Sequence, residues 1–391
     1  EHSTSAVQWK PLNTRKRAGE LMRDSLAHVA MGADAICFFQ WRQSKSGAEA
    51  FHSAMLPHAG ADSKVFRGVC ELGKALKTLS DAGLQGTELE RAGTAILFSA
   101  ESEWVTRSET LPSMKLNHWH DVRDWYRGFL DAGLRADVVP LAYDWTGYKT
   151  IVLPTVLSLS DEDVLRIADF AKAGGTVIVG YAAGLIDEHF HIGLGGYPGA
   201  GNGLLRDMLG IRSEEFNILG EEAEGELSEI SLSNGLTTRL WQNDVTSVAA
   251  DTTVLASYAG ESAADWELER TPAITSRPYG NGTAIYVGCD LNRHDIAQLL
   301  KALGSRWQEL SAQPTESGQT PTYPTTDPRI LHTIRRSADG STRFDFYLNR
   351  SNQPVAINGV EGDPIIAHRC ETDAVGYTLN RNAILIAKTS C

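Results

Sequence analysis

Hydrophobic residues in the first ninety positions form two helical patterns on either side of a short apolar run. The segment 14–33 has apolar residues at helical spacing, and Thr14 stands where a capping residue is expected. Residues Ala35–Trp41, "AICFFQW", predict a strand buried on both faces, and a second helix is expected near 63–83. Two strand–helix units are too few to close a barrel, so this segment is expected to be the end of a larger domain.

From about residue 92 the pattern alternates regularly between apolar strands and amphipathic helices. Strands are expected at 94–99, 136–141, 148–157, 176–184 and 282–291, and helices at 117–133, 161–175 and 293–304. Short links between such elements predict an open, flavodoxin-like parallel sheet. Residues 204–280 show no comparable regularity.

The last part of the chain has a different pattern. A segment rich in Pro, Thr and Ser, 311–327, precedes short alternating runs separated by turn residues, which predict a small antiparallel β domain. The pattern therefore divides the chain into a barrel tail, an α/β domain, a linker and a β domain, with the boundaries 1–90, 91–310, 311–327 and 328–391.

Composition and charge narrow the function classes. The 391 residues carry a formal net charge of -13, and an acidic surface of this kind disfavours nucleic acid or an anionic membrane as the main partner. No apolar run approaches the roughly 20 residues of a membrane-spanning helix. The cysteines are scattered and form no CxxC pair, which favours reduced thiols and a cytoplasmic location. They are Cys37, Cys70, Cys289, Cys370 and Cys391.

The first 55 residues contain the side chains that are most informative about function. Carboxylates, aromatic rings and an imidazole gather there, near the ends of expected barrel strands, where barrel enzymes place their active sites. Aromatic faces stack on the apolar face of a sugar, and carboxylates and imidazole bond its hydroxyls. Such rings also occur in cores, and such polar groups are often merely solvated, so these residues alone leave both interpretations open. The set is Glu1, Trp9, Phe39, Trp41, Arg42, Glu49 and His52.

Three motifs in order, "EHSTSAVQW", "FFQWRQ" and "GAEAFHSAMLPH", resemble the closing part of the catalytic barrel of family 42 glycoside hydrolases, which are β-galactosidases. The resemblance implies that Glu1 is the catalytic nucleophile and that Trp9 is the tryptophan that follows it in the family. It implies that Phe39 lines the galactose pocket. It also implies that Glu49 and His52 bind galactose hydroxyls.

The resemblance implies a three-part architecture and a mechanism. A barrel tail is followed by an α/β domain related to class I glutamine amidotransferases, which mediates homotrimers, and by a small β-sandwich. The implied activity is retaining hydrolysis of terminal β-D-galactosyl residues through a covalent galactosyl-enzyme, with no cofactor. Retention needs two carboxylates about 5 Å apart, and the acid/base glutamate belongs to a barrel strand that these residues lack.

We therefore expect the parent protein to be the enzyme and this chain to be inactive by itself. Two alternatives stay open. The chain is a non-catalytic oligomerisation scaffold, or the parent acts on another sugar, such as an α-L-arabinopyranoside.

Two histidine pairs raise the question of a metal site. His118 and His120 lie on an expected helix, where residues two apart point in different directions. His189 and His191 have no evident third ligand. We therefore expect no metal.

Two further features of the α/β domain invite a functional interpretation. The glycine-rich segment 193–203 matches no phosphate-binding motif and is expected to be a turn-rich loop, whose Tyr197 could reach a neighbouring subunit. An amidotransferase nucleophile would need a cysteine on a glycine-flanked elbow, and Cys289 lacks that context. We therefore expect this domain to be structural.

Overall fold

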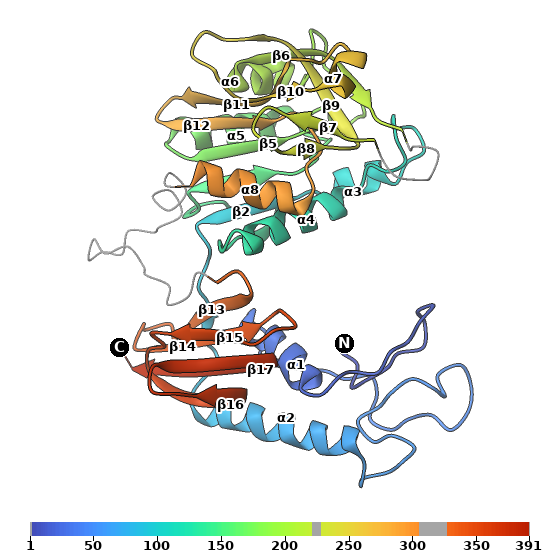
Figure 1. The fold of residues 1–391 in the computed structure, drawn as a ribbon, viewed down its shortest axis with the longest axis vertical. Helices are drawn as coiled ribbons and strands as arrows, with labels where there is room; N and C mark the ends of the chain where they lie inside the picture. Colours follow the sequence, from blue (N-terminus) through green and yellow to red (C-terminus); the bar gives the residue numbers. More distant parts are fainter. Residues whose placement is uncertain (1, 221–227, 305–326, 391) are drawn as a thin grey trace. The chain divides into compact units, whose positions relative to one another are not determined.

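The computed structural model describes residues 2–220, 228–304 and 327–390, which form two compact units. One unit contains the described residues up to Arg91 together with those from residue 327 onward, and the other contains those from Ala92 to residue 304. The first unit therefore joins the two ends of the sequence (Figure 1).

The first unit contains two helices, α1 (Glu20–Ala30) and α2 (Lys64–Asp81). The predicted second helix is confirmed, and the Ser63 side chain caps it by accepting a hydrogen bond from a backbone N–H of its first turn. The prediction that Thr14 caps the first helix is wrong, because α1 begins only after Gly19. Gly19 has a φ of 80°, and a Cβ there would lie 2.4 Å from the Arg369 side chain, so the helix starts where glycine is required.

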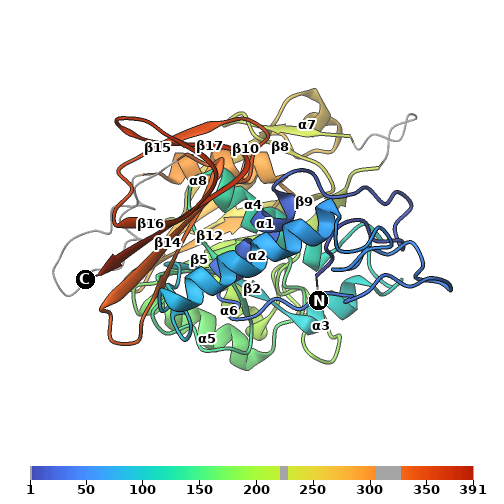
Figure 2. The ribbon, with the colours of Figure 1, turned by 90° about the horizontal axis from the view of Figure 1, so that it is seen from below.

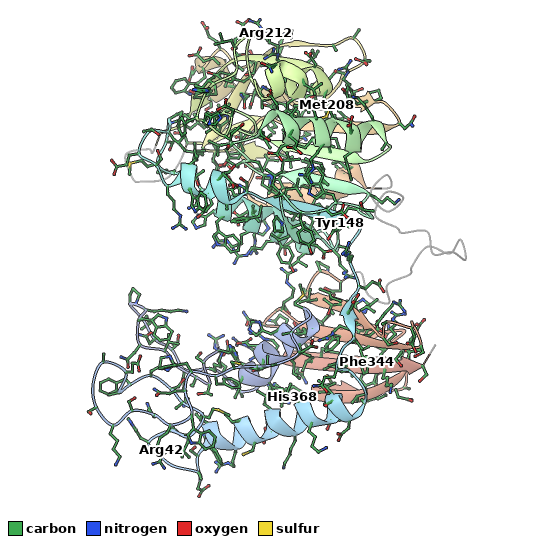
Figure 3. All side chains as sticks on the ribbon, turned by 180° about the vertical axis from the view of Figure 1, so that it is seen from behind. Arg42, Tyr148, Met208, Arg212, Phe344 and His368 are labelled. Atoms are coloured by element: carbon green, nitrogen blue, oxygen red, sulfur yellow. The ribbon has the colours of Figure 1, made fainter. Side chains whose placement is uncertain are left out.

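One antiparallel sheet of six strands completes this unit, in agreement with the predicted β domain. Its strands are β1 (Glu88–Leu89), β13 (Ile330–Arg336), β14 (Thr342–Asn349), β15 (Val355–Asn358), β16 (Asp363–Thr372) and β17 (Gly376–Ser390). Helices α1 and α2 cover one face of the sheet (Figures 1 and 2). Leu26, Leu72 and Leu79 pack there against strand residues such as Phe344 (Figure 3).

A buried arginine ties the C-terminal strands to the first helix. Arg335 of β13 is 1% exposed, and it donates hydrogen bonds of 3.0 Å to the carbonyl oxygens of Val29 and Ala33 at the end of α1. The neighbouring Thr333 donates to the Ala30 carbonyl at 2.8 Å. A cation and a donor at a helix C-terminus satisfy carbonyls that the helix leaves free, so these strands complete α1.

The strand expected at Ala35–Trp41 does not form, so that prediction is wrong. Its described pairing is an isolated parallel bridge between His2 and Phe38, and several of its residues are exposed. A strand buried on both faces needs neighbours on either side. Backbone hydrogen bonds join the segment to His2 near one end and to Met55 and Leu56 near the other, but they are too few to form a strand, and the segment is irregular.

The second unit is built on a nine-stranded mixed sheet with the order β3-β2-β4-β5-β12-β11-β10-β7-β8. Its parallel half consists of β2 (Thr94–Phe98), β3 (Asp137–Pro140), β4 (Thr150–Leu153), β5 (Thr176–Gly180) and β12 (Gly282–Val287). This half has the flavodoxin-like order that the sequence predicts.

An antiparallel extension, not predicted from the sequence, occupies the described residues between 211 and 279. Its strands in the main sheet are β7 (Ile230–Leu232), β8 (Thr237–Thr238), β10 (Thr253–Ala259) and β11 (Pro272–Tyr279). The strands β6 (Ile211–Ile218) and β9 (Trp241–Val248) form a separate pair.

Helices cover both faces of the main sheet (Figure 1). The cluster on one face includes residues of α4 (His118–Asp131) and α8 (Arg293–Leu303), and the cluster on the other includes residues of α5 (Asp161–Lys172) and α6 (Leu204–Leu209). Shorter helices are α3 (Ala100–Thr106), α7 (Glu261–Asp265) and a 3-10 turn at Gly201–Gly203. Within the described residues, no helix has both the length and the apolar character needed to cross a membrane.

Candidate active site

Hydrogen bonds join three segments of the first unit, residues 2–8, 37–43 and 51–56. The backbone N–H of His2 donates to the Cys37 carbonyl at 2.8 Å, and the N–H of Phe39 donates back to His2 at 3.1 Å. This is the hydrogen-bond pattern of two adjacent parallel strands. The two predicted strand ends therefore lie side by side, although neither forms a full strand.

The loop that carries Glu49 and His52 returns to both of these segments. The N–H of Met55 donates to the Gln40 carbonyl at 2.8 Å, and the N–H of Ser53 donates to the Ala6 carbonyl at 2.9 Å. The loop is thus fixed by backbone hydrogen bonds on two sides. Arg42, labelled in Figure 3, lies near the end of the segment 37–43, and its backbone forms an isolated parallel β-bridge with Leu56.

Three aromatic rings lie together, two from these segments and one from Trp9, the residue directly after the first segment. The Trp9 ring stacks on His52, with centroids 4.6 Å apart and an interplanar angle of 24°. The Phe39 and His52 rings form a T-shaped pair, with centroids 5.1 Å apart and an interplanar angle of 82°. His52 is fully buried, whereas Trp9 is 63% exposed. The cluster therefore has a closed side and an open aromatic face, which is the kind of surface that a sugar ring stacks on.

The two nitrogens of the buried His52 ring have different surroundings. Nδ1 lies 2.8 Å from the carbonyl oxygen of Ser53. Because a carbonyl can only accept, Nδ1 carries the proton, and Nε2 of the neutral ring is an acceptor. Nε2 is buried and has no hydrogen-bond partner among the described residues. Since a buried polar atom without a partner is costly, Nε2 stands out as an unused hydrogen-bond acceptor in this cluster.

The remaining predicted site residues are not part of the cluster of Trp9, Phe39 and His52. Glu49 is exposed, and its contact with the cluster is through the backbone, where its carbonyl accepts the His52 N–H at 3.0 Å. Trp41 is exposed at 62%. Glu1, the predicted nucleophile, lies outside the described residues.

Sequence reasoning missed the polar side chains that hold the cluster. The Thr4 hydroxyl donates to the Ala54 carbonyl at 2.9 Å, and Ser53 Oγ accepts from the Ser5 N–H at 2.9 Å. The Gln8 side-chain oxygen accepts from the Phe51 N–H at 2.9 Å. Serine, threonine and glutamine in polar loops are common, so the sequence offered no signal for them.

A cavity of about 780 Å³ in the same unit shares only Thr4 and Ser5 with these segments. It lies between the start of α1, the first turns of α2 and His368 of β16. None of the predicted site residues lines it, so cavity size alone does not identify the candidate site. The cluster of Trp9, Phe39 and His52 is the better guide to the site, because aromatic rings and an imidazole are groups that can bind a sugar.

The second unit has its own polar cluster, beside the carboxyl ends of its parallel strands. Asp121 of α4 accepts hydrogen bonds from the hydroxyls of Thr155 and Tyr181. Burial first, and then the nearby Asp290, raise the pKa of Asp121 to about 8. The adjoining cavity measures about 10 Å³, roughly the space of one water molecule, and leaves no room for a substrate.

Cys289 and His118 lie near the same edge of the sheet. Burial and Asp290 raise the pKa of the Cys289 thiol well above its usual range, so the sulfur is not a thiolate nucleophile. His118 is fully buried; its Nε2 accepts the Ser99 N–H at 2.9 Å, and its Nδ1 donates to the Pro154 carbonyl at 3.0 Å. Both nitrogens serve the fold, and burial lowers the pKa of His118 to about 4.

The other histidine pair belongs to a surface loop. One carboxylate oxygen of Asp187 accepts hydrogen bonds from the backbone N–H groups of His189 and His191. The other carboxylate oxygen of Asp187 lies 3.2 Å from Nδ1 of His191. Among the described residues, no group of three or more His, Cys, Asp or Glu side chains is arranged to hold a metal ion. In the glycine-rich loop Tyr197 packs against Phe216, so its ring is not the free end of that loop.

Comparison with known proteins follows the same division of the chain. The family model for β-galactosidase matches residues 1–79, the β-galactosidase trimerisation domain matches 92–311, and the β-galactosidase C-terminal domain matches 330–389.

Similar proteins of known identity cover nearly the whole chain. The β-galactosidase BbgII of Bifidobacterium bifidum is 43% identical over 390 residues, which are 99% of this chain and 54% of that protein. A β-galactosidase from Arthrobacter sp is 37% identical over 369 residues, 94% of this chain and 49% of its own. The chain thus spans about half the length of the curated relatives it matches.

A solved structure shares the fold throughout. Gan42B, a family 42 β-galactosidase from G. stearothermophilus, superimposes with a TM-score of 0.84 and 25% identity, covering 100% of this chain and 53% of that one. The similarity includes the barrel tail, the α/β domain and the C-terminal β domain. The chain belongs to the family 42 β-galactosidases of the glycoside hydrolases.

Proposed function

We propose that this chain is the nucleophile-bearing part of a retaining β-galactosidase. In this proposal Glu1 attacks the anomeric carbon, Trp9 stacks on the galactose ring and Phe39 lines the pocket. Glu49 and His52 bind hydroxyls. The observation that carries the proposal is the cluster of Trp9 and Phe39 around His52, because the rings come from separate segments and the buried Nε2 has no partner among the described residues.

The mechanism follows from the chemistry of retention. A carboxylate nucleophile forms a covalent glycosyl-enzyme, and a second carboxyl group protonates the leaving oxygen and later activates water. The two groups must lie about 5 Å apart. We expect the second carboxyl group on a barrel strand outside these residues, so the chain should need that part of the barrel for turnover.

The decisive variant is Glu1→Gln in a protein in which the rest of the barrel precedes this chain, so that the barrel is complete. The amide keeps the shape of the side chain but cannot act as the nucleophile, so turnover of a β-galactoside should fall by a factor of at least 1,000, with unchanged thermal unfolding. Comparison with an α-L-arabinopyranoside on the unsubstituted protein tests the alternative sugar. A Gln variant that retains substantial galactosidase activity would refute the role of Glu1.

A second role, in assembly, is supported by the match of residues 92–311 to a trimerisation domain. We infer that this domain holds three copies together and acts as a scaffold even without catalysis. The loop containing the 90% exposed Leu194 is a candidate contact with a neighbouring subunit. Light scattering on the 391-residue chain should give three times the mass of one copy, and a monomer at micromolar concentration would count against the assembly role.

A cytoplasmic location is also part of the proposal. The described cysteines, Cys37, Cys70, Cys289 and Cys370, are all free thiols, which suits a reducing compartment. Cell fractionation of the producing organism would test it.

A further inference from the structure

Two buried hydroxyl-bearing residues connect the segment after Glu1 to the loop that carries His52. Thr4 is 2% exposed and Ser53 is 8% exposed. The Thr4 hydroxyl donates to the Ala54 carbonyl, and the Ser53 hydroxyl accepts from the backbone N–H of Ser5, both at 2.9 Å. Together with the Gln8 side chain, which accepts from the Phe51 N–H, these are the side-chain members of a set of bonds that otherwise involves backbone groups.

Three polar atoms of Ser53 have hydrogen-bond partners in this region. Its N–H donates to the Ala6 carbonyl at 2.9 Å, its Oγ accepts from Ser5, and its carbonyl accepts the Nδ1–H of His52 at 2.8 Å. The carbonyl bond determines which nitrogen of His52 carries the proton. Holding Ser53 in place therefore holds the His52 ring with Nε2 as the acceptor.

We propose that Thr4 and Ser53 are positioning residues, which fix the His52 imidazole in the Nδ1–H form against the segment that follows Glu1. The inference rests on the proposed function, because His52 matters to turnover only if it binds the sugar. Neither hydroxyl has to touch the substrate. Each acts through the geometry of the loop, since a small displacement of a binding group weakens substrate binding.

The kinetic test uses Thr4→Val and Ser53→Ala in the protein with a complete barrel. Thr4→Val keeps the volume and removes the donor, while Ser53→Ala removes a single oxygen. Since His52 would bind galactose in both the ground state and the transition state, each variant should raise KM about tenfold and leave kcat within about twofold. Thr4→Ser restores a hydroxyl and should return KM to its original value.

Matched controls separate this role from a general loss of stability. Thr87 and Thr333 are also buried in this unit, and their hydroxyls donate to the carbonyls of Leu84 at 2.7 Å and Ala30 at 2.8 Å. Thr87→Val and Thr333→Val should lower the unfolding temperature as Thr4→Val does, without changing KM. If Ser53→Ala and Thr4→Val lower stability but leave KM unchanged within twofold, the positioning role is overturned.

A second measurement does not depend on turnover. Long-range nitrogen–proton NMR spectra of the 391-residue chain report which nitrogen of His52 is protonated. The unsubstituted chain should show the Nδ1–H form, and Ser53→Ala should show a mixture of the two forms. A chain with the Nε2–H form, or a Ser53→Ala variant with an unchanged ring, overturns the inference even if the enzyme is a galactosidase. If the protein with a complete barrel shows no galactosidase turnover while the chain gives the expected spectra, the proposed function is refuted instead.

Discussion

The two fully buried histidines of this protein make a useful comparison. His118 in the α/β domain has both ring nitrogens bonded to backbone groups. His52 in the barrel tail has one nitrogen bonded and the other without a partner among the described residues, next to a largely exposed Trp9. Burial alone therefore does not separate a structural histidine from a functional one. What separates the two is whether the second ring nitrogen has a hydrogen-bond partner.

Replacing His118 should have the largest effect on stability. His118→Leu leaves the Ser99 N–H and the Pro154 carbonyl buried without partners, and each loss costs about 1–3 kcal/mol. We expect the free energy of unfolding of this unit to fall by about 3 kcal/mol, measured by denaturant unfolding. In the protein with a complete barrel KM should not change. An unaltered unfolding midpoint would show that these two bonds do not stabilise the fold.

Replacing His52 should impair galactosidase kinetics and leave the fold intact, which is the opposite of what we expect for His118. His52→Ala removes the candidate acceptor and the ring on which Trp9 stacks. In the protein with a complete barrel we expect kcat/KM for a β-galactoside to fall about a hundredfold. A conformational readout such as near-UV circular dichroism should show that the fold persists. If His52→Ala destabilises the protein as His118→Leu does, with normal kinetics in the folded fraction, the distinction between the two histidines fails.

The buried carboxyl of the α/β domain should make its stability depend on pH. The folded pKa of Asp121 is raised to about 8, so between pH 4 and 8 the folded state retains a proton that the unfolded state has lost. The contribution of Asp121 to stability should therefore fall as pH rises through this range, by at most about 1.4 kcal/mol per pH unit, and level off above pH 8.

Asp121→Asn tests that dependence, because the amide oxygen still accepts from Thr155 and Tyr181 without carrying charge. Near pH 4 the two should be equally stable, and the variant should become more stable than the original as pH rises towards 8, by at most about 1.4 kcal/mol per pH unit. His118, whose pKa is lowered to about 4, acts with the opposite sign, so its contribution is lost as pH falls from 6.5 towards 4. Parallel stability curves for the Asn variant and the original would contradict the assignment.

The smallest predicted effect concerns a helix cap in the α/β domain. The side chains of Ser160 and Asp163 form a capping box at the start of α5. Ser160→Ala should lower stability by about 1 kcal/mol and leave galactosidase kinetics unchanged. A thermal melt alongside a KM measurement checks both parts. A kinetic effect from this position would mean that the α/β domain contributes more to the active site than we infer.

The sequence predicted the elements whose patterns are regular. The parallel strands and the helices α2, α4, α5 and α8 have clear apolar periods and, in each helix, a capping Ser or Asn. The antiparallel strands β6 and β10 were missed because register shifts at Ser213 and Ala256 interrupt their alternation. Strand β16 was missed for the same reason and because it contains Pro364, which argues against a strand.

The candidate site was predictable to a different degree. Its aromatic and imidazole members could be selected from the sequence because their residue types are suited to sugar binding, and the structure brings Trp9, Phe39 and His52 together. Their supporting hydroxyls could not be selected. The bonds of Thr4 and Ser53 join positions about fifty residues apart, and no local pattern encodes such a contact.

A crystal structure of the Glu1→Gln protein with a complete barrel and a bound β-galactoside tests the central claim most directly. The account predicts the galactose ring against the Trp9 face, with a sugar hydroxyl within hydrogen-bond distance of His52 Nε2. The same atom should still be bonded to no protein group. Galactose bound elsewhere, or a protein group occupying Nε2, would contradict it.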